Sequence, residues 1–257
     1  MHVNNVLCAC YSLDNKFIAV GGKDYKIKIW NIDTKRLVQT LNNHTDIALC
    51  VCYSPDNNFI IAGSNNNSVK IWNAKTGNLI RSLNGHTDWI RCVCYSSDNK
   101  SIASASDDKS VKLWDANTGI LMRTLYGCDY WIHGICYSPD NEFIASRSGD
   151  KSIQIWNVNT GIIVQTLSDH TSTVSCICYS PNNNFIASGS YDNSVKIWDT
   201  KTGILIRTQN GHTDCVTFVC YSSDNNFIVS GSSDKTIKIW DAITGNLIRT
   251  LTGFKMH

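Results

Sequence analysis

The chain has 257 residues, of which 42% are hydrophobic and 17% are charged, and its formal net charge is +2. A chain of this length can bury a substantial core, while so small a net charge gives no argument for binding nucleic acid or an anionic membrane. We expect no secretory signal, because the first residues lack a basic region followed by an apolar run, and no membrane span, because no apolar stretch approaches roughly 20 residues.

The chain contains twelve cysteines. In a chain without an export signal, cysteines are more often free thiols in a reducing compartment than members of a disulfide framework. We therefore expect a cytoplasmic or nuclear location.

Tryptophans recur every 42 residues, without an insertion, at Trp30, Trp72, Trp114, Trp156, Trp198 and Trp240. A period of 40 to 45 residues is typical of β-propeller blades, each built from four strands. The sequence therefore predicts six repeats within a single domain that spans residues 1–257. The repeats cover approximately residues 2–43, 44–85, 86–127, 128–169, 170–211 and 212–253.

The third repeat shows the order of the predicted elements. Residues 90–96 form an apolar first strand, and the turn formers SSDN lead to a second strand at 101–106. Asp107 and Asp108 make a tight connection to the third strand, and Gly119 supplies a left-handed turn before the fourth, at 120–125. These short runs do not sustain helical spacing, so each repeat is predicted to be a four-stranded antiparallel meander.

One such meander buries little surface alone. Its strands are apolar on both faces, so each sheet needs a neighbour on either side, which a closed ring provides. The predicted fold class is therefore all-β: a six-bladed β-propeller with four antiparallel strands per blade and 42-residue repeats. We expect blades 1 and 6 to close the ring by packing side by side. Completion by another chain, or membership of a longer array, are the alternatives.

Two dipeptides mark the repeats: Trp-Asp at 114–115, 198–199 and 240–241, replaced by Trp-Asn in the other three, and Gly-His at 85–86 and 211–212. With these motifs the chain resembles the WD-repeat family of β-propellers. The resemblance implies a structural tetrad of a His, a second-strand Ser, the turn Asp and the Trp. Complete sets are His86, Ser104, Asp108, Trp114; His170, Ser188, Asp192, Trp198; and His212, Ser230, Asp234, Trp240.

Three blades depart from the tetrad. Blade 1 keeps His2 but has Val20 in the Ser position, blade 2 has Ala62 and Asn66, and blade 4 has Cys128 in place of the His. Each lost tetrad hydrogen bond costs roughly 0.5–1.5 kcal/mol. We expect blades 2 and 4 to be the softer ones.

Metal binding and catalysis find little support. His86, Cys92 and Cys94 are spaced like metal ligands, but the first Cys position is Gly134 and Phe218 in other repeats, and no fourth ligand for zinc is evident. We interpret these cysteines as small buried hydrophobic residues and expect no metal and no cofactor. Nucleophile-elbow, phosphate-loop and His-Glu-x-x-His motifs are missing, so we expect a non-enzymatic scaffold that binds proteins or peptides.

Binding residues are predicted where the six copies differ at exposed positions. In WD-repeat proteins, partners often meet the loops before the first strand and between strands two and three, which we call the tetrad-side face. The resemblance implies contacts three and five residues after the tetrad His and just before the turn Asp. Trp and Arg are common interface anchors, and Tyr126 and Tyr130 add aromatic surface nearby. The candidate residues are Trp89, Arg91, Asp107, Trp131, His133, Arg147 and Tyr191.

Other interpretations stay open. Trp89 and Trp131 can instead pack between blades, and Arg147 can fill space beside Cys128. Narrower forms of the binding hypothesis are an aromatic cage for a modified lysine and an acidic-peptide pocket at Arg91 and Arg147. A nucleic-acid-associated subunit and a propeller hydrolase are alternative functions. However, regular spacing around the ring favours solvated edges rather than a nucleic-acid stripe for Lys28, Lys70, Lys112, Lys196 and Lys238 and for Arg81, Arg123, Arg207 and Arg249.

Overall fold

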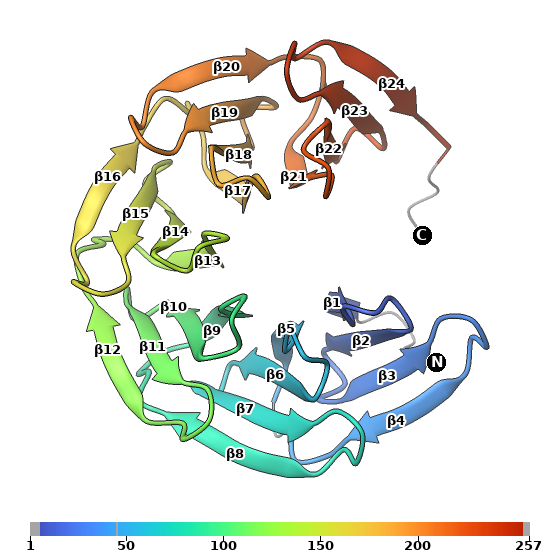
Figure 1. The fold of residues 1–257 in the computed structure, drawn as a ribbon. Helices are drawn as coiled ribbons and strands as arrows, with labels where there is room; N and C mark the ends of the chain where they lie inside the picture. Colours follow the sequence, from blue (N-terminus) through green and yellow to red (C-terminus); the bar gives the residue numbers. More distant parts are fainter. Residues whose placement is uncertain (1–5, 45, 254–257) are drawn as a thin grey trace. The chain divides into compact units, whose positions relative to one another are not determined.

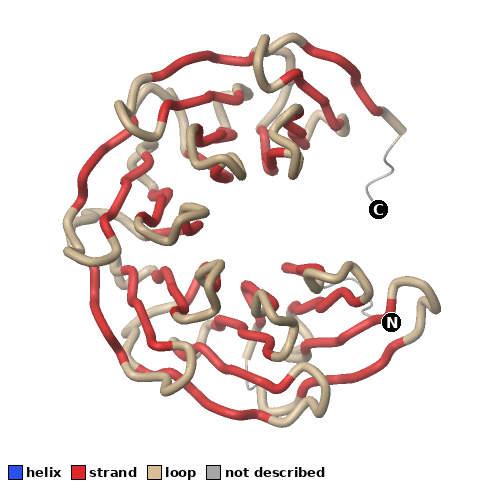
Figure 2. Tube along the Cα trace, viewed as in Figure 1, coloured by secondary structure: helices blue, strands red, loops and turns tan. Residues whose placement is uncertain are grey.

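The computed structural model describes residues 6–44 and 46–253, and these residues form strands joined by turns (Figures 1 and 2). The strands make six antiparallel sheets of four, and each sheet contains four consecutive strands. We call each sheet a blade. The predicted fold class, all-β with six β-propeller blades of four antiparallel strands, is confirmed.

The strands occupy equivalent positions in every blade. Blade 1 contains β1 (Val6–Tyr11), β2 (Phe17–Gly22), β3 (Ile27–Asn31) and β4 (Leu37–Leu41); blade 2, β5 (Ala48–Tyr53), β6 (Phe59–Ser64), β7 (Ser68–Asn73) and β8 (Leu79–Asn84); blade 3, β9 (Ile90–Tyr95), β10 (Ser101–Ser106), β11 (Val111–Asp115) and β12 (Leu121–Leu125). Blade 4 contains β13 (Ile132–Tyr137), β14 (Phe143–Ser148), β15 (Ile153–Asn157) and β16 (Ile163–Leu167); blade 5, β17 (Val174–Tyr179), β18 (Phe185–Ser190), β19 (Val195–Asp199) and β20 (Leu205–Gln209); blade 6, β21 (Val216–Tyr221), β22 (Phe227–Ser232), β23 (Ile237–Asp241) and β24 (Leu247–Leu251).

The chain divides into two compact units, Met1–Ile135 and Cys136–His257. Blades 1 to 3 and the start of β13 belong to the first unit, and the rest of blade 4 with blades 5 and 6 belongs to the second. Each unit is described by itself. The single domain and the closure of the ring stay predictions.

The turns follow the local sequence. Between β9 and β10, Asn99 takes the left-handed conformation with φ 64°, which Asn tolerates better than most residues. Ser96 Oγ donates to Asp98 Oδ1 at 2.6 Å and accepts from the Ser101 amide at 2.9 Å, which closes the turn. Gly119, before β12, has φ 74°, as its predicted turn requires.

Consecutive blades pack through a large side chain set against a small one. Ile90, the first residue of β9, is fully buried, and a Cβ added to Gly63 on β6 would lie 2.4 Å from its Cγ2. The same Cβ would lie 2.9 Å from the Cys50 sulfur of the same blade. Burial raises the pKa of the Cys50 thiol well above its ordinary value. Cys50 therefore packs as a small apolar residue.

The structure corrects the expectation of solvated lysine edges. Lys112, Lys196 and Lys238, on the third strands, are only 6–8% exposed. Each ammonium group donates to a threonine hydroxyl on the fourth strand of its own blade, at 3.0–3.1 Å: Thr124, Thr208 and Thr250. Residues i and j directly opposite on paired strands are near neighbours, and Lys112 is opposite Thr124. These three lysines are therefore not available as a solvated edge.

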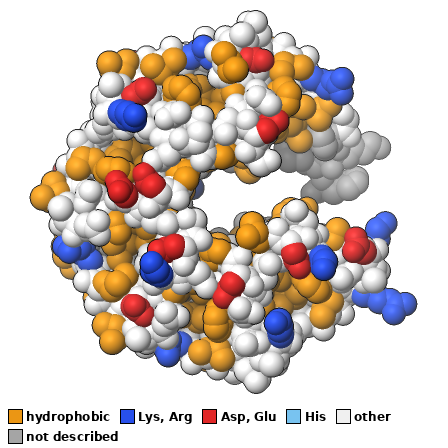
Figure 3. Space-filling model, viewed as in Figure 1, with side chains coloured by type: hydrophobic (Ala, Val, Ile, Leu, Met, Phe, Trp, Pro, Cys, Tyr) orange, Lys and Arg blue, Asp and Glu red, His pale blue; other side chains and the backbone are white. Residues whose placement is uncertain are grey.

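Charged side chains are scattered over the face shown in Figure 3 rather than gathered in one basic patch.

Two further observations concern metal ions and membranes. Among residues 6–44 and 46–253, no group of three His, Cys, Asp or Glu side chains is arranged to hold a metal ion. The same residues include no helix of the length and hydropathy needed to span a membrane.

Candidate partner-binding site

In blade 3, the tetrad residues form one hydrogen-bonded chain. The His86 Nδ1 group donates to Asp108 Oδ2 at 2.7 Å, and Ser104 Oγ lies 2.8 Å from His86 Nε2. The Trp114 indole donates to the same Ser104 oxygen at 2.8 Å. Because Asp108 also accepts from the Thr87 amide at 3.1 Å, the network fixes the loop before β9 against the β10–β11 turn. Blade 5 (His170, Ser188, Asp192, Trp198) and blade 6 (His212, Ser230, Asp234, Trp240) have the same hydrogen bonds.

The charge state of the tetrad follows from burial and hydrogen bonding. Burial acts to raise the pKa of Asp192, but hydrogen bonds from Ser194 and His170 outweigh it and lower the pKa to about 2. Burial lowers the pKa of His170, against the opposing influence of Asp192. At neutral pH Asp192 is therefore ionised and His170 is neutral, with Nδ1 of His170 protonated and Nε2 accepting a hydrogen bond from Ser188.

Blade 2 shows what the missing serine changes. With Ala62 in that position, the Trp72 indole donates to the Asn42 carbonyl at 2.8 Å. His44 Nδ1 contacts the Asp46 carbonyl at 2.6 Å instead of a turn carboxylate, and its Nε2 atom is buried without a hydrogen-bond partner. The blade 2 network is thus reduced, as its sequence predicts.

The other two departures differ from each other. In blade 4 the Trp156 indole still donates to Ser146 at 2.7 Å, while Cys128 is buried in the first unit. In blade 1, Asp24 accepts from Lys28 at 3.0 Å. His2 lies outside the described residues.

On the tetrad-side face of blade 3, Trp89, Arg91 and Asp107 lie together. The Arg91 guanidinium donates from Nε at 2.9 Å and from Nη2 at 2.6 Å to the Asp107 carboxylate, and its central carbon lies 4.9 Å from the Trp89 ring centroid. The Asp107 amide donates to the Trp89 carbonyl at 2.9 Å. The indole is 42% exposed and is held from one side by an ion pair.

A second exposed indole stands at the corresponding position of the next repeat. Trp131 is 54% exposed and makes an edge contact with the His133 ring, whose centroid is 6.3 Å away. The residue after each tryptophan, Ile90 or Ile132, is fully buried. The isoleucines therefore make the packing contacts at these positions. This favours a binding role for both tryptophans over a role in packing between blades.

The first strands of these repeats are connected within the first unit, since the Cys92 thiol donates to the Ile135 carbonyl at 3.7 Å. A comparison with protein families matches the WD domain, G-beta repeat, at residues 1–31, 35–73, 77–115, 119–157, 161–199 and 203–241. The chain belongs to the WD-repeat family. A search of curated proteins found no match.

The WD repeat and the blade are offset by one strand. Each matched stretch after the first begins before the fourth strand of one blade and ends with the third strand of the next, as residues 77–115 do with β8 to β11. Each of these five stretches therefore joins two consecutive sheets covalently. A loop of the tetrad-side face lies within each such stretch, between the two blades it joins.

Arg147 and Tyr191, the remaining candidate residues, belong to the second unit. Arg147 occupies the position that is small in the other WD repeats and donates to the Val174 carbonyl of blade 5 at 3.3 Å. Tyr191 is 53% exposed, and its amide donates to the Thr173 carbonyl at 3.0 Å. Arg147 thus takes part in packing between blades 4 and 5, while Tyr191 presents its side chain to solvent.

Sequence reasoning missed one aromatic contact. The Lys112 ammonium group lies 6.0 Å from the ring centroid of Tyr126, which is exposed. The sequence suggested an edge charge or a nucleic-acid contact for Lys112, whereas its position opposite Thr124 on the paired strand fixes where the ammonium group ends. The pairing of these strands was the signal that could have located it.

Proposed function

We propose that this protein is a non-enzymatic WD-repeat scaffold that binds a protein or peptide through its tetrad-side face, with Trp89 and Trp131 as anchors. WD-repeat propellers generally act as scaffolds for proteins or peptides. The observation that carries the proposal is the pair of exposed indoles at one position of consecutive repeats, each supported by a polar neighbour. Tryptophan held in place by its surroundings loses little side-chain entropy on binding.

The ion pair narrows the chemistry of the partner. Because Nε and Nη2 of Arg91 both already donate to the Asp107 carboxylate, the guanidinium charge is largely offset. An acidic peptide therefore gains less there than an apolar or aromatic side chain that covers the indole. This supports a partner that presents a hydrophobic side chain, rather than an acidic peptide.

Nucleic acid is a weaker candidate. Three of the five lysines that suggested it are buried on the third strands of blades 3, 5 and 6, so these three cannot release counterions from a phosphate backbone. The twelve cysteines are free thiols, which supports a cytoplasmic or nuclear location for the scaffold.

The test is affinity capture with the native protein and a Trp89→Ala, Arg91→Ala, Trp131→Ala variant. A Thr173→Ala variant, altered at the same position of blade 5, is the control, and all three proteins must unfold at similar urea concentrations. We expect the triple variant to lose partners that the native protein and the control both retain. If the triple variant captures the same partners at the same yield, the proposed site is wrong.

A further inference from the structure

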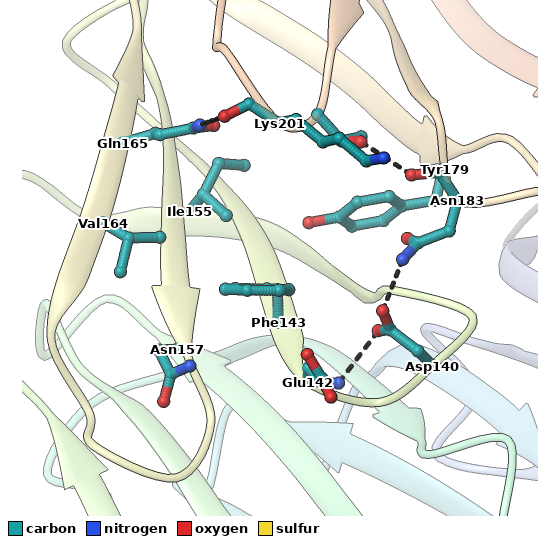
Figure 4. A pocket seen from close by; sticks show the side chains of 11 residues that line it. Asp140, Glu142, Phe143, Ile155, Asn157, Val164, Gln165, Tyr179, Asn183 and Lys201 are labelled. Atoms are coloured by element: carbon teal, nitrogen blue, oxygen red, sulfur yellow. Dashed lines mark hydrogen bonds between the residues drawn. The ribbon is translucent and has the colours of Figure 1, made fainter.

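A groove opens between blades 4 and 5, within the second unit and at the strand ends opposite the tetrads (Figure 4). Its volume is about 570 Å³, which is within the range of ligand-binding cavities. Phe143, Ile155 and Val164 of blade 4 form an apolar wall, and Tyr179 of blade 5 faces them.

Three buried polar atoms in this groove have no hydrogen-bond partner among the described residues: the Tyr179 hydroxyl, Gln165 Oε1 and Asn183 Oδ1. Gln165 Nε2 donates to the Lys201 carbonyl at 2.8 Å, which fixes the orientation of the amide and leaves its oxygen unpaired. A phenol can donate and an amide oxygen can accept. Together they complement the carbonyl and N–H groups of a peptide, and buried polar groups are normally paired.

Two carboxylates lie at one end of the groove, which we call the acidic mouth, while the exposed Lys201 lines the other end. Glu142, the only glutamate in the chain, is exposed there beside Asp140. The Asp140 carboxylate accepts hydrogen bonds from Ser138, Asn183 and the Glu142 amide. Other repeats carry only Lys or Asn at the Glu142 position: Lys16, Asn58, Lys100, Asn184 and Asn226.

The corresponding groove between blades 5 and 6 is different in size and charge. Its volume is about 310 Å³. Arg207 replaces Gln165, and its Nη2 reaches the Ile243 carbonyl at 2.8 Å. Asn182 replaces Asp140, so this groove has no acidic mouth. The groove between blades 1 and 2 is also about 310 Å³. The larger volume and the glutamate are therefore not shared with these two grooves, although Asp14 lines the groove between blades 1 and 2.

We propose that the groove between blades 4 and 5 binds a peptide segment that presents a hydrophobic side chain close to a lysine or arginine. The hydrophobic side chain lies against Phe143, Ile155 and Val164. A peptide group of the segment pairs with Tyr179 and Gln165, and the basic side chain meets Glu142. This site is separate from the tetrad-side face and does not depend on the proposed function of Trp89 and Trp131.

The test measures binding of short, capped, fluorescent peptides by anisotropy. Each peptide has a Gly-Ser background, one leucine or phenylalanine, and one lysine at varied spacing; matched peptides carry glutamate in place of the lysine. We expect at least one lysine peptide to bind the native protein and its glutamate counterpart to bind about tenfold more weakly, because an attraction becomes a repulsion. If no lysine peptide binds, or if the glutamate peptides bind equally well, the proposal is wrong.

Variants borrowed from the other repeats locate the binding. Glu142→Asn and Gln165→Arg introduce residues that other repeats carry at these positions, so folding is preserved. We expect Glu142→Asn to weaken binding of the lysine peptide about tenfold and Gln165→Arg, which fills the groove, to abolish it. Arg207→Gln in the neighbouring groove and Trp89→Ala on the tetrad-side face are controls that leave binding unchanged. Unchanged affinity in both groove variants would overturn the proposal.

Discussion

The tetrad serine of blade 3 is the sharpest test of how these blades are stabilised. Ser104 is fully buried and contacts two groups, the Trp114 indole and His86 Nε2, each at 2.8 Å. Ser104→Ala removes both partners at once. A buried polar group left unpaired costs about 1–3 kcal/mol, so the upper limit for two such groups is about 6 kcal/mol.

Blade 2 shows how much of this cost relaxation removes. There alanine already occupies the position, and the Trp72 indole finds a backbone carbonyl, while His44 Nε2 is buried and unpaired. If Trp114 adopts the same solution in the variant, only His86 loses its partner. The expected destabilisation is therefore about 2 kcal/mol.

Urea unfolding followed by tryptophan fluorescence measures the loss, and hydrogen exchange shows whether it is confined to blade 3. Thr87→Ala, which removes an exposed hydroxyl from the neighbouring loop, is the control and should change stability by less than about 0.5 kcal/mol. A loss for Ser104→Ala no larger than that of Thr87→Ala would refute the reasoning. So would faster exchange spread evenly over all blades.

Three further predictions follow from burial and packing. The pKa of Asp192 is about 2 in the folded protein and about 3.9 in an unfolded chain. This difference contributes about 2 kcal/mol of stability at neutral pH, which is lost as pH falls from about 4 through 2. Urea titrations at several pH values should show a smaller loss of stability in acid for Asp192→Asn. A Cβ at Gly189 would lie 2.5 Å from Val216 Cγ1, whereas a Cβ at Gly231 would have its nearest neighbour at 3.7 Å. Gly189→Ala should therefore lower the urea midpoint of unfolding, and Gly231→Ala should not. Equal effects of the two substitutions would contradict this. Burial raises the pKa of the Cys50 thiol, so mass spectrometry after brief alkylation at neutral pH should find Cys50 unmodified until urea unfolds the protein.

The strands and turns could be predicted from the sequence because their causes are local. Asn99 and Gly119 take left-handed backbone conformations, which the short polar side chain of Asn tolerates and the missing Cβ of Gly permits. The 42-residue period places equivalent residues at equivalent points of every blade. The tetrads needed more than local information, because Ser104 meets His86 across 18 residues; the family resemblance supplied that pairing.

Sequence reasoning missed the contacts of side chains that extend to a neighbouring strand. Lys112 was expected in solvent but ends at Thr124, since the residue opposite it on the paired strand decides what its ammonium group meets. Arg91 and Asp107 were both predicted as partner-binding residues, but their ion pair with each other was not predicted. Residue type alone gives the charge of a side chain but not the charge of its neighbours.

The groove between blades 4 and 5 lies at the limit of sequence reasoning. Glu142 is conspicuous in the sequence as the only glutamate, but nothing local connects it with Gln165 or Tyr179. The sequence by itself determined the repeat, the strand pattern and the family, because these depend on periodicity and on the conformational preferences of single residues. Only the tertiary structure decided which side chains are exposed, paired or left without a partner, because those states depend on atoms that adjacent strands and blades bring together.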